Sequence, residues 1–174
     1  ADPYEAVYEF QTGVETEDTR ELEEKAVTYT TEAFAEDFHM TGHGLASLWV
    51  SCSAEDTDLF VTVSDIDENG NSRQITDGRL RASKRKQTPA PYCFLDRPWI
   101  TGNAADIRKL TPGKAYKLEL DLMPTNYIVK AGHRIRVSVT CAEKGFYFQK
   151  PENGMTLKVH HNRLCPSYIE FKTV

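Results

Sequence analysis

Short acidic and glycine-containing motifs are the parts of this sequence whose residue types and spacing could do chemistry. Residues 65–71, DIDENGN, begin like a calcium-binding loop, which needs closely spaced oxygens and a bidentate Glu at its twelfth position. Thr76 occupies that position, and no helix pattern flanks the motif. Asn69 and Gly70 instead predict a hairpin turn, because they readily adopt the positive φ angles that a tight turn between strands requires.

A glycine-rich stretch and a histidine pair are the other motifs that suggest a ligand. Gly42-His43-Gly44 imitates a dinucleotide fingerprint, but the third glycine is missing and the following residues predict a strand, not a helix that could hold a pyrophosphate. His160 and His161 are the only adjacent pair among the five histidines, and neighbours in a strand point to opposite faces. We therefore expect no cofactor and no metal site.

The spaced motifs of hydrolytic enzymes are absent from the sequence. It contains neither the G-x-S-x-G nucleophile elbow nor the H-E-x-x-H metalloprotease helix. A Ser-His-Asp triad could be assembled from distant residues, but no pattern points to one. Asp56 and Asp58 could in principle serve glycoside chemistry, although an Asp pair at the entry of a strand more commonly caps a turn or pairs with an arginine. We predict no catalytic residue and no enzymatic activity for this chain by itself.

Charge and hydropathy exclude further partners. The 174 residues include 21 basic and 26 acidic side chains, and the resulting net charge of −5 gives no footprint for a phosphate backbone. No window approaches 18 consecutive apolar residues, and the first residues lack the basic and apolar regions of a signal peptide. We expect neither nucleic acid nor membrane as a partner. Because residue 1 is not Met, we also expect a processed product or a piece of a longer protein.

The four cysteines, at positions 52, 93, 141 and 165, do not form a recognisable framework. They could pair in three ways, but two of them fall on strand faces that the alternation marks as inward, and none has metal-ligand spacing. A chain of this length buries a core without disulfides. Free thiols are therefore expected, and the compartment stays undetermined.

An alternation of apolar and polar residues with a period of two is the strongest periodic signal. Residues 116–122 and 134–141 each turn one set of side chains toward a core and the other toward solvent. Further candidate strands, bounded by turn residues, are 27–31, 46–52, 59–66, 73–80, 155–161 and 168–173. Helix patterns are short, at residues 15–24 and in a turn capped by Asn103 that runs to Lys109. Many short strands without helical crossovers predict an all-β fold, a jelly-roll β-sandwich.

The pattern predicts one domain over residues 1–174, with a lead-in segment at 1–25 and a long loop at 84–111 that is rich in proline and aromatic residues. The predicted inward-facing core set is Leu48, Val50, Leu118, Leu120, Ile135, Val137 and Val139. Trp49 has the opposite parity to its neighbours Leu48 and Val50, so something outside the sandwich core must cover it. The loop 84–111 and a partner domain are the two candidates for that cover.

Short motifs occur in a characteristic order over residues 25–174. They are VTYTT (27–31), Gly42-His43, LWVS (48–51), DTDLFV (56–61), DGRLRAS (77–83), LTPG (110–113), LMPT (122–125), AGHRIRV (131–137) and Pro166-Ser167-Tyr168. This series resembles the C-terminal domain of the X-Pro dipeptidyl-peptidase and cocaine-esterase family of serine hydrolases. The resemblance implies a galactose-binding-like jelly roll, in agreement with the predicted strands. Residues 84–106 and the stretch FYFQ at 146–149 depart from the family pattern.

The resemblance implies an accessory role. In that family the catalytic Ser, Asp and His belong to a preceding α/β-hydrolase domain, and the C-terminal domain packs on it, helps to shape the substrate entrance and supports assembly. The partner implied is therefore the α/β-hydrolase domain of the same parent protein. The sequence leaves open whether the chain also forms a homo-oligomer with a second copy of itself. Among the motif residues, Gly132 is expected to make the turn into a strand, and Arg134 or Arg136 to pair with a carboxylate such as Asp58.

A carbohydrate-binding module is the competing function, because the same architecture also binds sugars and exposed aromatic rings can stack on a pyranose. The candidate residues for an interface or a sugar platform are Trp49, Tyr92, Phe94 and Trp99. Large apolar patches usually mark an interface. We therefore predict a contiguous aromatic patch built from the loop 84–111.

Overall fold

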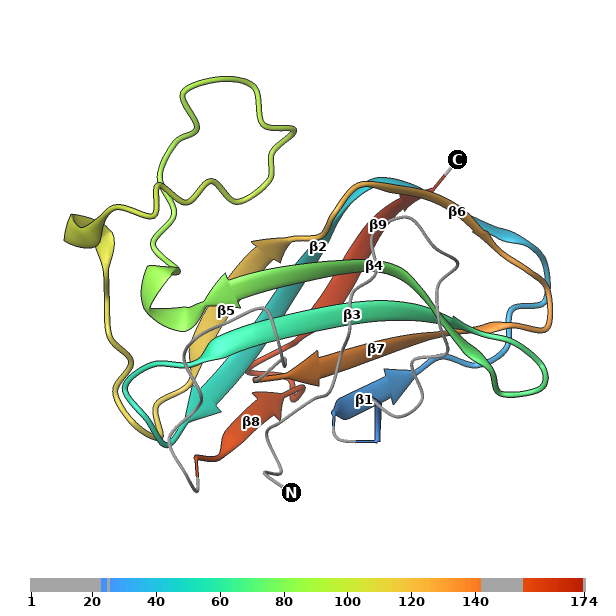
Figure 1. The fold of residues 1–174 in the computed structure, drawn as a ribbon, viewed down its shortest axis with the longest axis horizontal. Helices are drawn as coiled ribbons and strands as arrows, with labels where there is room; N and C mark the ends of the chain where they lie inside the picture. The colour runs from blue at the N-terminus through green and yellow to red at the C-terminus, as the bar shows by residue number, and fades with distance from the viewer. Residues whose placement is uncertain (1–22, 25, 142–154, 174) are drawn as a thin grey trace.

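Two antiparallel β-sheets pack face to face in the computed structural model, which describes residues 23–24, 26–141 and 155–173 (Figure 1). The β3 sheet has the order β1-β7-β3-β4, and the β2 sheet is built around the long strand β2, which pairs with β5, β6, β8 and β9. The strands are β1 (Val27–Thr30), β2 (Phe38–Cys52), β3 (Asp58–Ile66), β4 (Ser72–Arg81), β5 (Tyr116–Asp121), β6 (Thr125–Val129), β7 (Arg134–Thr140), β8 (Leu157–His160) and β9 (Tyr168–Thr173). The predicted jelly-roll sandwich is confirmed.

The core lies between the two sheets and contains the residues that the alternation placed there. Leu118 and Leu120 of β5 and Val139 of β7 are almost completely buried, whereas Lys117 faces outward. Six of the seven predicted core residues are buried, and the seventh, Val137, is half-buried against the same cluster. Burial of this continuous apolar layer is the main stabilising contribution to the fold.

The first half of β2 and the strand β6 were not predicted as strands. Gly42 and Gly44 interrupt the apolar pattern, and yet the chain continues through them as one strand with an irregular register between Thr41 and Leu45. β2 pairs with β6 before this irregularity and with β5 after it. Gly42 has a positive φ of 77°, and a Cβ at Gly44 would collide with the ring of Phe171. The glycines therefore permit a bulge rather than a phosphate-binding loop.

The motif that resembled a calcium loop forms the hairpin turn between β3 and β4. The carboxylate of Asp67 accepts hydrogen bonds from the backbone N–H groups of Asn69 and Asn71 and from the Asn71 side chain, each at 2.8 Å. These bonds hold the pKa of Asp67 below its ordinary value. Only Gly70 has a positive φ in this turn, whereas Asn69 does not. The predicted hairpin is confirmed, with one left-handed residue instead of two.

The prediction that Arg134 or Arg136 pairs with a carboxylate is confirmed, but the carboxylate is not Asp58. Asp58 binds Arg81, its cross-strand neighbour on β4, through two hydrogen bonds of 2.8 and 2.9 Å. Arg136 pairs instead with the buried Glu23 at 2.6 Å, and Arg134 lies 3.5 Å from the exposed Glu32. The two arginines project from β7, where Arg134 lies opposite Ile66 and Arg136 opposite Ser64 of β3, so the register keeps both away from Asp58 at the other end of that strand.

Two other expectations concern helices and turns. The predicted helical turn after Asn103 is a single 3-10 turn, η2 (Ala104–Asp106), and the Asn103 side chain makes no capping bond. Another 3-10 turn, η1 (Ala82–Lys84), ends β4. The turn expected at Gly132 is confirmed by its φ of 84° directly before β7. The possible helix at 15–24 and the FYFQ stretch lie largely or wholly outside the described residues, and no helix of the described part is long and apolar enough to cross a membrane.

Candidate functional site: an aromatic arm and an apolar groove

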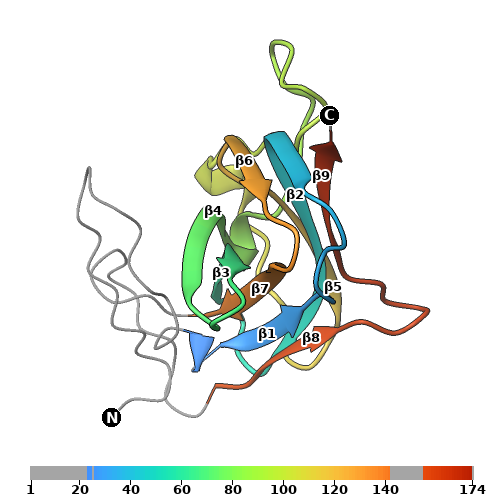
Figure 2. The ribbon, with the colours of Figure 1, turned by 90° about the vertical axis from the view of Figure 1, so that its right-hand side faces the viewer.

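Residues 84–111 form a long excursion, here called the arm, that stands away from the two sheets (Figures 1 and 2). Both of its ends are fastened to the sandwich. The fastening contacts are the backbone hydrogen bonds from Arg108 to Ser83 and from Leu110 to Glu55, both 2.7 Å, and the ion pair Lys109–Glu55, while the ion pair Lys86–Asp106 joins the two ends of the arm to each other. A further backbone bond of 3.0 Å from Thr88 to Trp99 closes the outer part of the arm into a loop. The arm is therefore an ordered projection on a fixed base.

Three aromatic rings gather within the outer loop of the arm. Tyr92 lies 6.1 Å from Phe94 and 5.2 Å from Trp99, measured between ring centroids, and Phe94 lies 5.2 Å from Trp99. All three contacts are edge-to-face, with interplanar angles of 70–81°, which is a favourable geometry for aromatic pairs. Tyr92 is 56% exposed and the neighbouring Leu95 is 57% exposed. This aromatic trio is thus packed on itself, with Tyr92 exposed and Phe94 and Trp99 half-buried.

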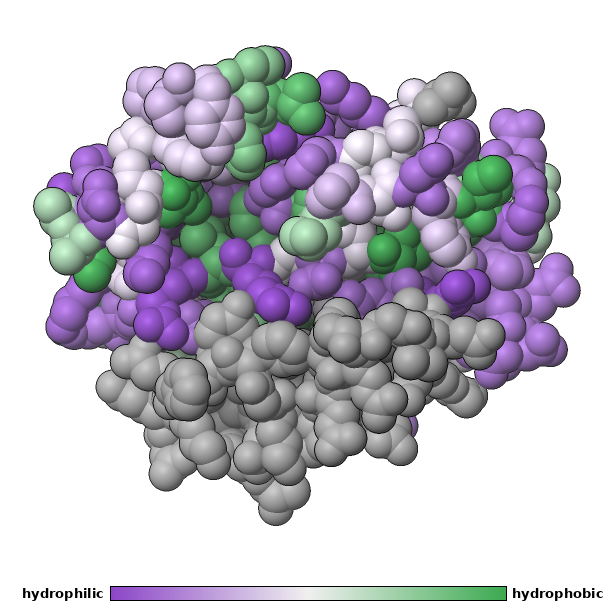
Figure 3. All heavy atoms as spheres, turned by 45° about the horizontal axis from the view of Figure 1, so that its top comes forward, coloured by the Kyte–Doolittle hydropathy of each residue, from purple (hydrophilic) through white to green (hydrophobic). Residues whose placement is uncertain are grey.

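Pale spheres lie at the upper left of Figure 3 and green ones beside them at the top, on the side where Figure 1 shows the arm, and further green and white groups lie among hydrophilic residues elsewhere on this face. The outer face of the β2 sheet lies beside the arm. Gln87 of the arm donates a hydrogen bond of 3.0 Å to Glu119 on β5, and Arg97 lies 3.9 Å from Glu170 on β9. The arm thus contacts strands on both sides of β2.

Trp49 lies on that same outer face, as its parity required. It is half-buried, and its cross-strand neighbours are Lys117 on β5 and His160 on β8. Within the described part of the chain, the ring contacts of the trio do not extend to Trp49. The structure therefore brings together three of the four predicted aromatic residues and leaves the fourth apart from their ring cluster.

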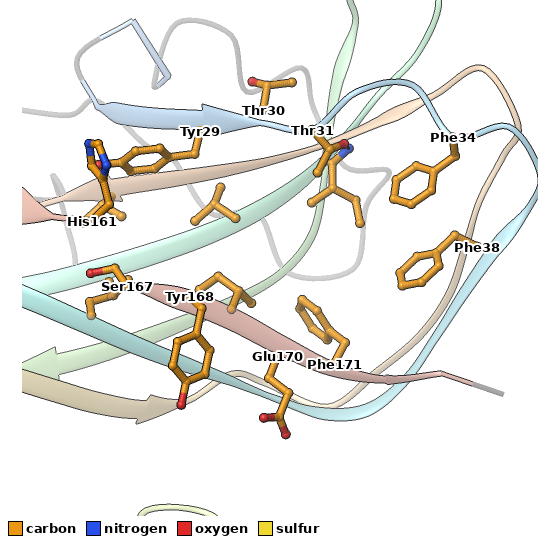
Figure 4. Close-up of a pocket in the computed structure, with 15 residues that line it drawn as sticks. Tyr29, Thr30, Thr31, Phe34, Phe38, His161, Ser167, Tyr168, Glu170 and Phe171 are labelled. Atoms are coloured by element: carbon orange, nitrogen blue, oxygen red, sulfur yellow. The ribbon is translucent and has the colours of Figure 1, made fainter. Parts of the chain in front are cut away.

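The other candidate site is an apolar groove of about 810 Å³ at the open edge of the sandwich, between β1 and β9 (Figure 4). Its inner wall consists of core residues from both sheets, among them Leu48 and Ile135. Its mouth carries two aromatic pairs, namely Phe34 stacked on Phe38 at 4.9 Å and Tyr29 edge-on to His161 at 5.7 Å. Sequence reasoning missed this groove, because it arises only where the two sheets end beside each other.

Three histidine rings contact a carboxylate or a hydroxyl group, as the histidine of a catalytic site does. The ring nitrogen Nδ1 of His133 lies 2.9 Å from Asp65, and His43 Nδ1 lies 2.9 Å from Asp121. His160 Nε2 lies 2.9 Å from the hydroxyl of Ser51. No serine joins either histidine–carboxylate pair, and no carboxylate orients His160 among the interactions of the described residues. The described residues also contain no group of three or more candidate metal ligands.

Among these groups, Asp65 has the most hydrogen-bond partners, and its bonds stabilise the fold. Asp65 is buried on β3 and accepts hydrogen bonds from the hydroxyl of Tyr127 on β6 at 2.8 Å and from His133 before β7. Burial, followed by the bond to Asp65, raises the pKa of Tyr127 to about 12. Asp56 likewise accepts bonds from the N–H and hydroxyl of Ser83 at the end of β4. Asp56 therefore binds the turn η1 and Asp58 pairs with Arg81, in agreement with the prediction that these acids cap a turn or pair with an arginine.

The described residues form a β-sandwich domain with an aromatic arm and an apolar groove. The model of the X-Pro dipeptidyl-peptidase C-terminal non-catalytic domain matches residues 2–170. The chain belongs to this family of non-catalytic domains, as the order of its motifs indicated.

Similar proteins are larger hydrolases. The chain is 31% identical over 159 residues to a Mycobacterium bovis protein named "Putative serine esterase", covering 90% of this chain and 25% of that protein. It is 26% identical over 126 residues to cocaine esterase of Rhodococcus sp., covering 72% of this chain and 19% of the esterase. A CocE/NonD family hydrolase structure from Staphylococcus aureus shares the fold with a TM-score of 0.74 at 20% identity, over 92% of this chain and 34% of that one. The chain thus spans a quarter or less of these two curated relatives.

Proposed function

We propose that this chain is the C-terminal accessory domain of an α/β-hydrolase-type serine hydrolase and that it packs on the catalytic domain and helps to shape the substrate entrance. The observation that carries this proposal is the family match over residues 2–170, taken with the small share of each relative that the chain spans. A domain that accounts for so little of a hydrolase leaves room for a separate catalytic domain in the same polypeptide.

The side chains of the described residues support a role in contact rather than in chemistry. A hydrolytic site needs a nucleophile, a base and an oxyanion-stabilising group within mutual reach. Here Ser51 contacts a histidine that lacks an orienting acid, Asp65 accepts a bond from Tyr127 on another strand, and Asp56 accepts bonds from Ser83 in the turn η1. The aromatic trio and the groove, by contrast, are apolar surfaces of the kind that mark protein interfaces.

The geometry of the trio favours a protein partner over a sugar. A pyranose stacks on the open face of an aromatic ring, and several such rings form a platform when their faces are exposed side by side. The three rings of the arm meet edge-to-face at 70–81° and so occupy part of one another's faces. Carbohydrate binding therefore remains the weaker candidate, and a glycan array with the Tyr92→Ala and Trp99→Ala variants would test it.

The test of the accessory role uses the complete parent protein, a form cut before residue 1, and the 174-residue chain alone. We expect the 174-residue chain to show no turnover of X-Pro dipeptide anilides or short aryl esters beyond a heat-denatured control. The complete protein should hydrolyse one of these substrate classes, and the truncated form should show an altered KM or lose solubility. Turnover by the isolated chain that a serine-directed inhibitor abolishes would contradict the proposal, as would a parent protein without a hydrolase domain.

A further inference from the structure

We propose that the tip of the arm, formed by Tyr92, Phe94, Leu95 and Trp99, is the surface on which the catalytic domain of the same polypeptide docks. This inference rests on the proposed accessory function and deepens it, because it selects one surface of the domain as the interface. The occupant is the α/β-hydrolase domain, not a second copy of the chain and not a free ligand.

The arm tip does not serve the core of its own domain. The buried core cluster includes Ala82 and Leu110 at the two ends of the arm, and Ile100 packs partly against it. Tyr92, Phe94 and Trp99 are not in that cluster. Ordering a long loop costs conformational entropy, and rings that stay exposed, as Tyr92 does, or half-buried, as Phe94 and Trp99 do, offset only part of it through burial within the domain. A surface that covered the tip would bury apolar area that the domain leaves exposed.

The tip is also held in one arrangement before any partner arrives. The three mutual ring contacts fix the orientation of each ring, and the bond from Thr88 to Trp99 closes the loop that carries them. Leu95 and Asp96 are consecutive left-handed residues, with φ of 54° and 57°, a conformation that persists only where its surroundings enforce it. A preorganised apolar surface loses less entropy on binding than a mobile one.

The chemistry of the tip suits a protein surface. Tyr and Trp are among the residues that dominate binding energy at protein interfaces, where they fill pockets of the partner. Arg97, next to this tip, has a side chain only 6% exposed, its Nε has no hydrogen-bond partner, and its one described ion pair, to Glu170, spans 3.9 Å. A side chain so nearly buried is not part of a solvent-exposed rim, so the exposed side chains offered to a partner are those of Tyr92 and Leu95.

The length of the relatives identifies the partner. This chain spans 25% of the Mycobacterium bovis protein and 34% of the Staphylococcus aureus hydrolase chain, so most of each related protein consists of other domains. A domain in the same polypeptide is present at high effective concentration, and a modest apolar surface is enough to hold it. The groove between β1 and β9 is another apolar surface of this domain, and the Tyr168→Ser variant tests whether it takes this role instead.

Cys93 provides a natural reporter for the docking surface. It lies between Tyr92 and Phe94 and is an exposed free thiol in the structure of this chain, whereas Cys165 is a half-buried thiol in the turn between β8 and β9. The experiment labels the native complete parent protein with a thiol reagent and follows both cysteines by peptide mass spectrometry, relative to the unfolded protein. We expect labelling of Cys93 to be slowed by about tenfold or more, because the reagent reaches it only when the interface opens.

The double variant Tyr92→Ser/Phe94→Ser should raise the labelling rate of Cys93 in the parent protein toward its unfolded value while leaving Cys165 unchanged. The matched control is Tyr168→Ser, which removes an exposed tyrosine that lines the groove and lies outside the arm. If native Cys93 reacts as fast as in the unfolded protein, or if only the Tyr168 variant loosens the domain contact, the arm tip is not the docking surface but the accessory function stands. If the parent contains no hydrolase domain, the accessory function itself fails.

Discussion

The interior of the sandwich and the tip of the arm use apolar residues in opposite ways. Leu118 and Val139 are fully or almost fully buried between two sheets that the same chain supplies. Tyr92 and Leu95 are more than half exposed on a projection that contributes little to that interior. The comparison separates residues that make the domain fold from residues whose burial requires another molecule. Both groups are apolar. They differ because the same chain covers the core residues and leaves Tyr92 and Leu95 exposed.

The same contrast holds for charges. On β3 and β4, Asp58 and Arg81 form a two-bond pair that is largely shielded from solvent. At the base of the arm, Lys109 and Glu55 form a pair in which both side chains are more than 60% exposed. Because water and salt screen exposed pairs, the second pair contributes little to stability even though it is geometrically close.

The largest effect is expected in the core. Leu120→Ala should lower the free energy of unfolding by about 2 to 5 kcal/mol, because it removes buried methyl groups and leaves a cavity between the sheets. The neighbouring Lys117→Ala, on the outer face, should cost less than about 0.5 kcal/mol. Urea denaturation followed by circular dichroism measures both. Equal losses for the two variants would mean that the assigned faces of β5 are wrong.

A smaller loss is expected from the shielded charge pair. Asp58→Asn removes the negative charge opposite Arg81 and should cost about 1 to 3 kcal/mol, since the guanidinium keeps only a neutral acceptor. Glu55→Gln makes the same chemical change in the exposed pair with Lys109. It should leave the urea midpoint unchanged, and an equal loss in both variants would show that shielding does not matter here.

Alkaline pH gives a third test, directed at the bond that joins β6 to β3. The pKa of Tyr127 is raised to about 12 in the folded protein, whereas an unfolded tyrosine titrates near about 10. Between these two values the unfolded state releases the proton and the folded state retains it, so stability falls as pH rises. The stability difference between wild type and Tyr127→Phe should therefore be largest below pH 10 and shrink toward pH 12. Urea midpoints across that range measure it, and a constant difference would contradict the assignment.

The smallest effect on stability is expected at the arm tip. Tyr92→Ser/Phe94→Ser should change the free energy of unfolding of this chain by less than about 1 kcal/mol, because neither ring belongs to the core cluster. Chemical denaturation alongside Leu120→Ala provides the comparison. A loss as large as that of the core variant would mean that the tip stabilises the domain as the core does, and the difference between the arm tip and the core would disappear.

Much of the fold could be predicted because the period of two is a local property. Alternation placed Leu118, Leu120 and Val139 in the core correctly, and it assigned Trp49 to the opposite face from Leu48. It failed where the pattern is interrupted or short. The glycines at 42 and 44 hid the first half of β2, and β6 has only five residues after a proline. The candidate residues of the arm were found from composition, since three aromatics in one proline-containing loop need no register to be noticed.

The sequence by itself determined the class of fold, the inward and outward faces of most strands, and the residue types available for contact or chemistry. Only the tertiary structure decided which side chains meet. Pairing backward from Ile66 and Ser72 would set Leu80 opposite Asp58, but the irregularity between Val63 and Ser64 shifts the register by one, so Arg81 is opposite instead. Arg136 similarly meets Glu23, 113 residues away, because the chain before β1 returns to β7. Such partners depend on strand register and on sheet order. A shift of one residue in the register changes which side chains face each other, and the spacing of residues along the chain does not specify the register.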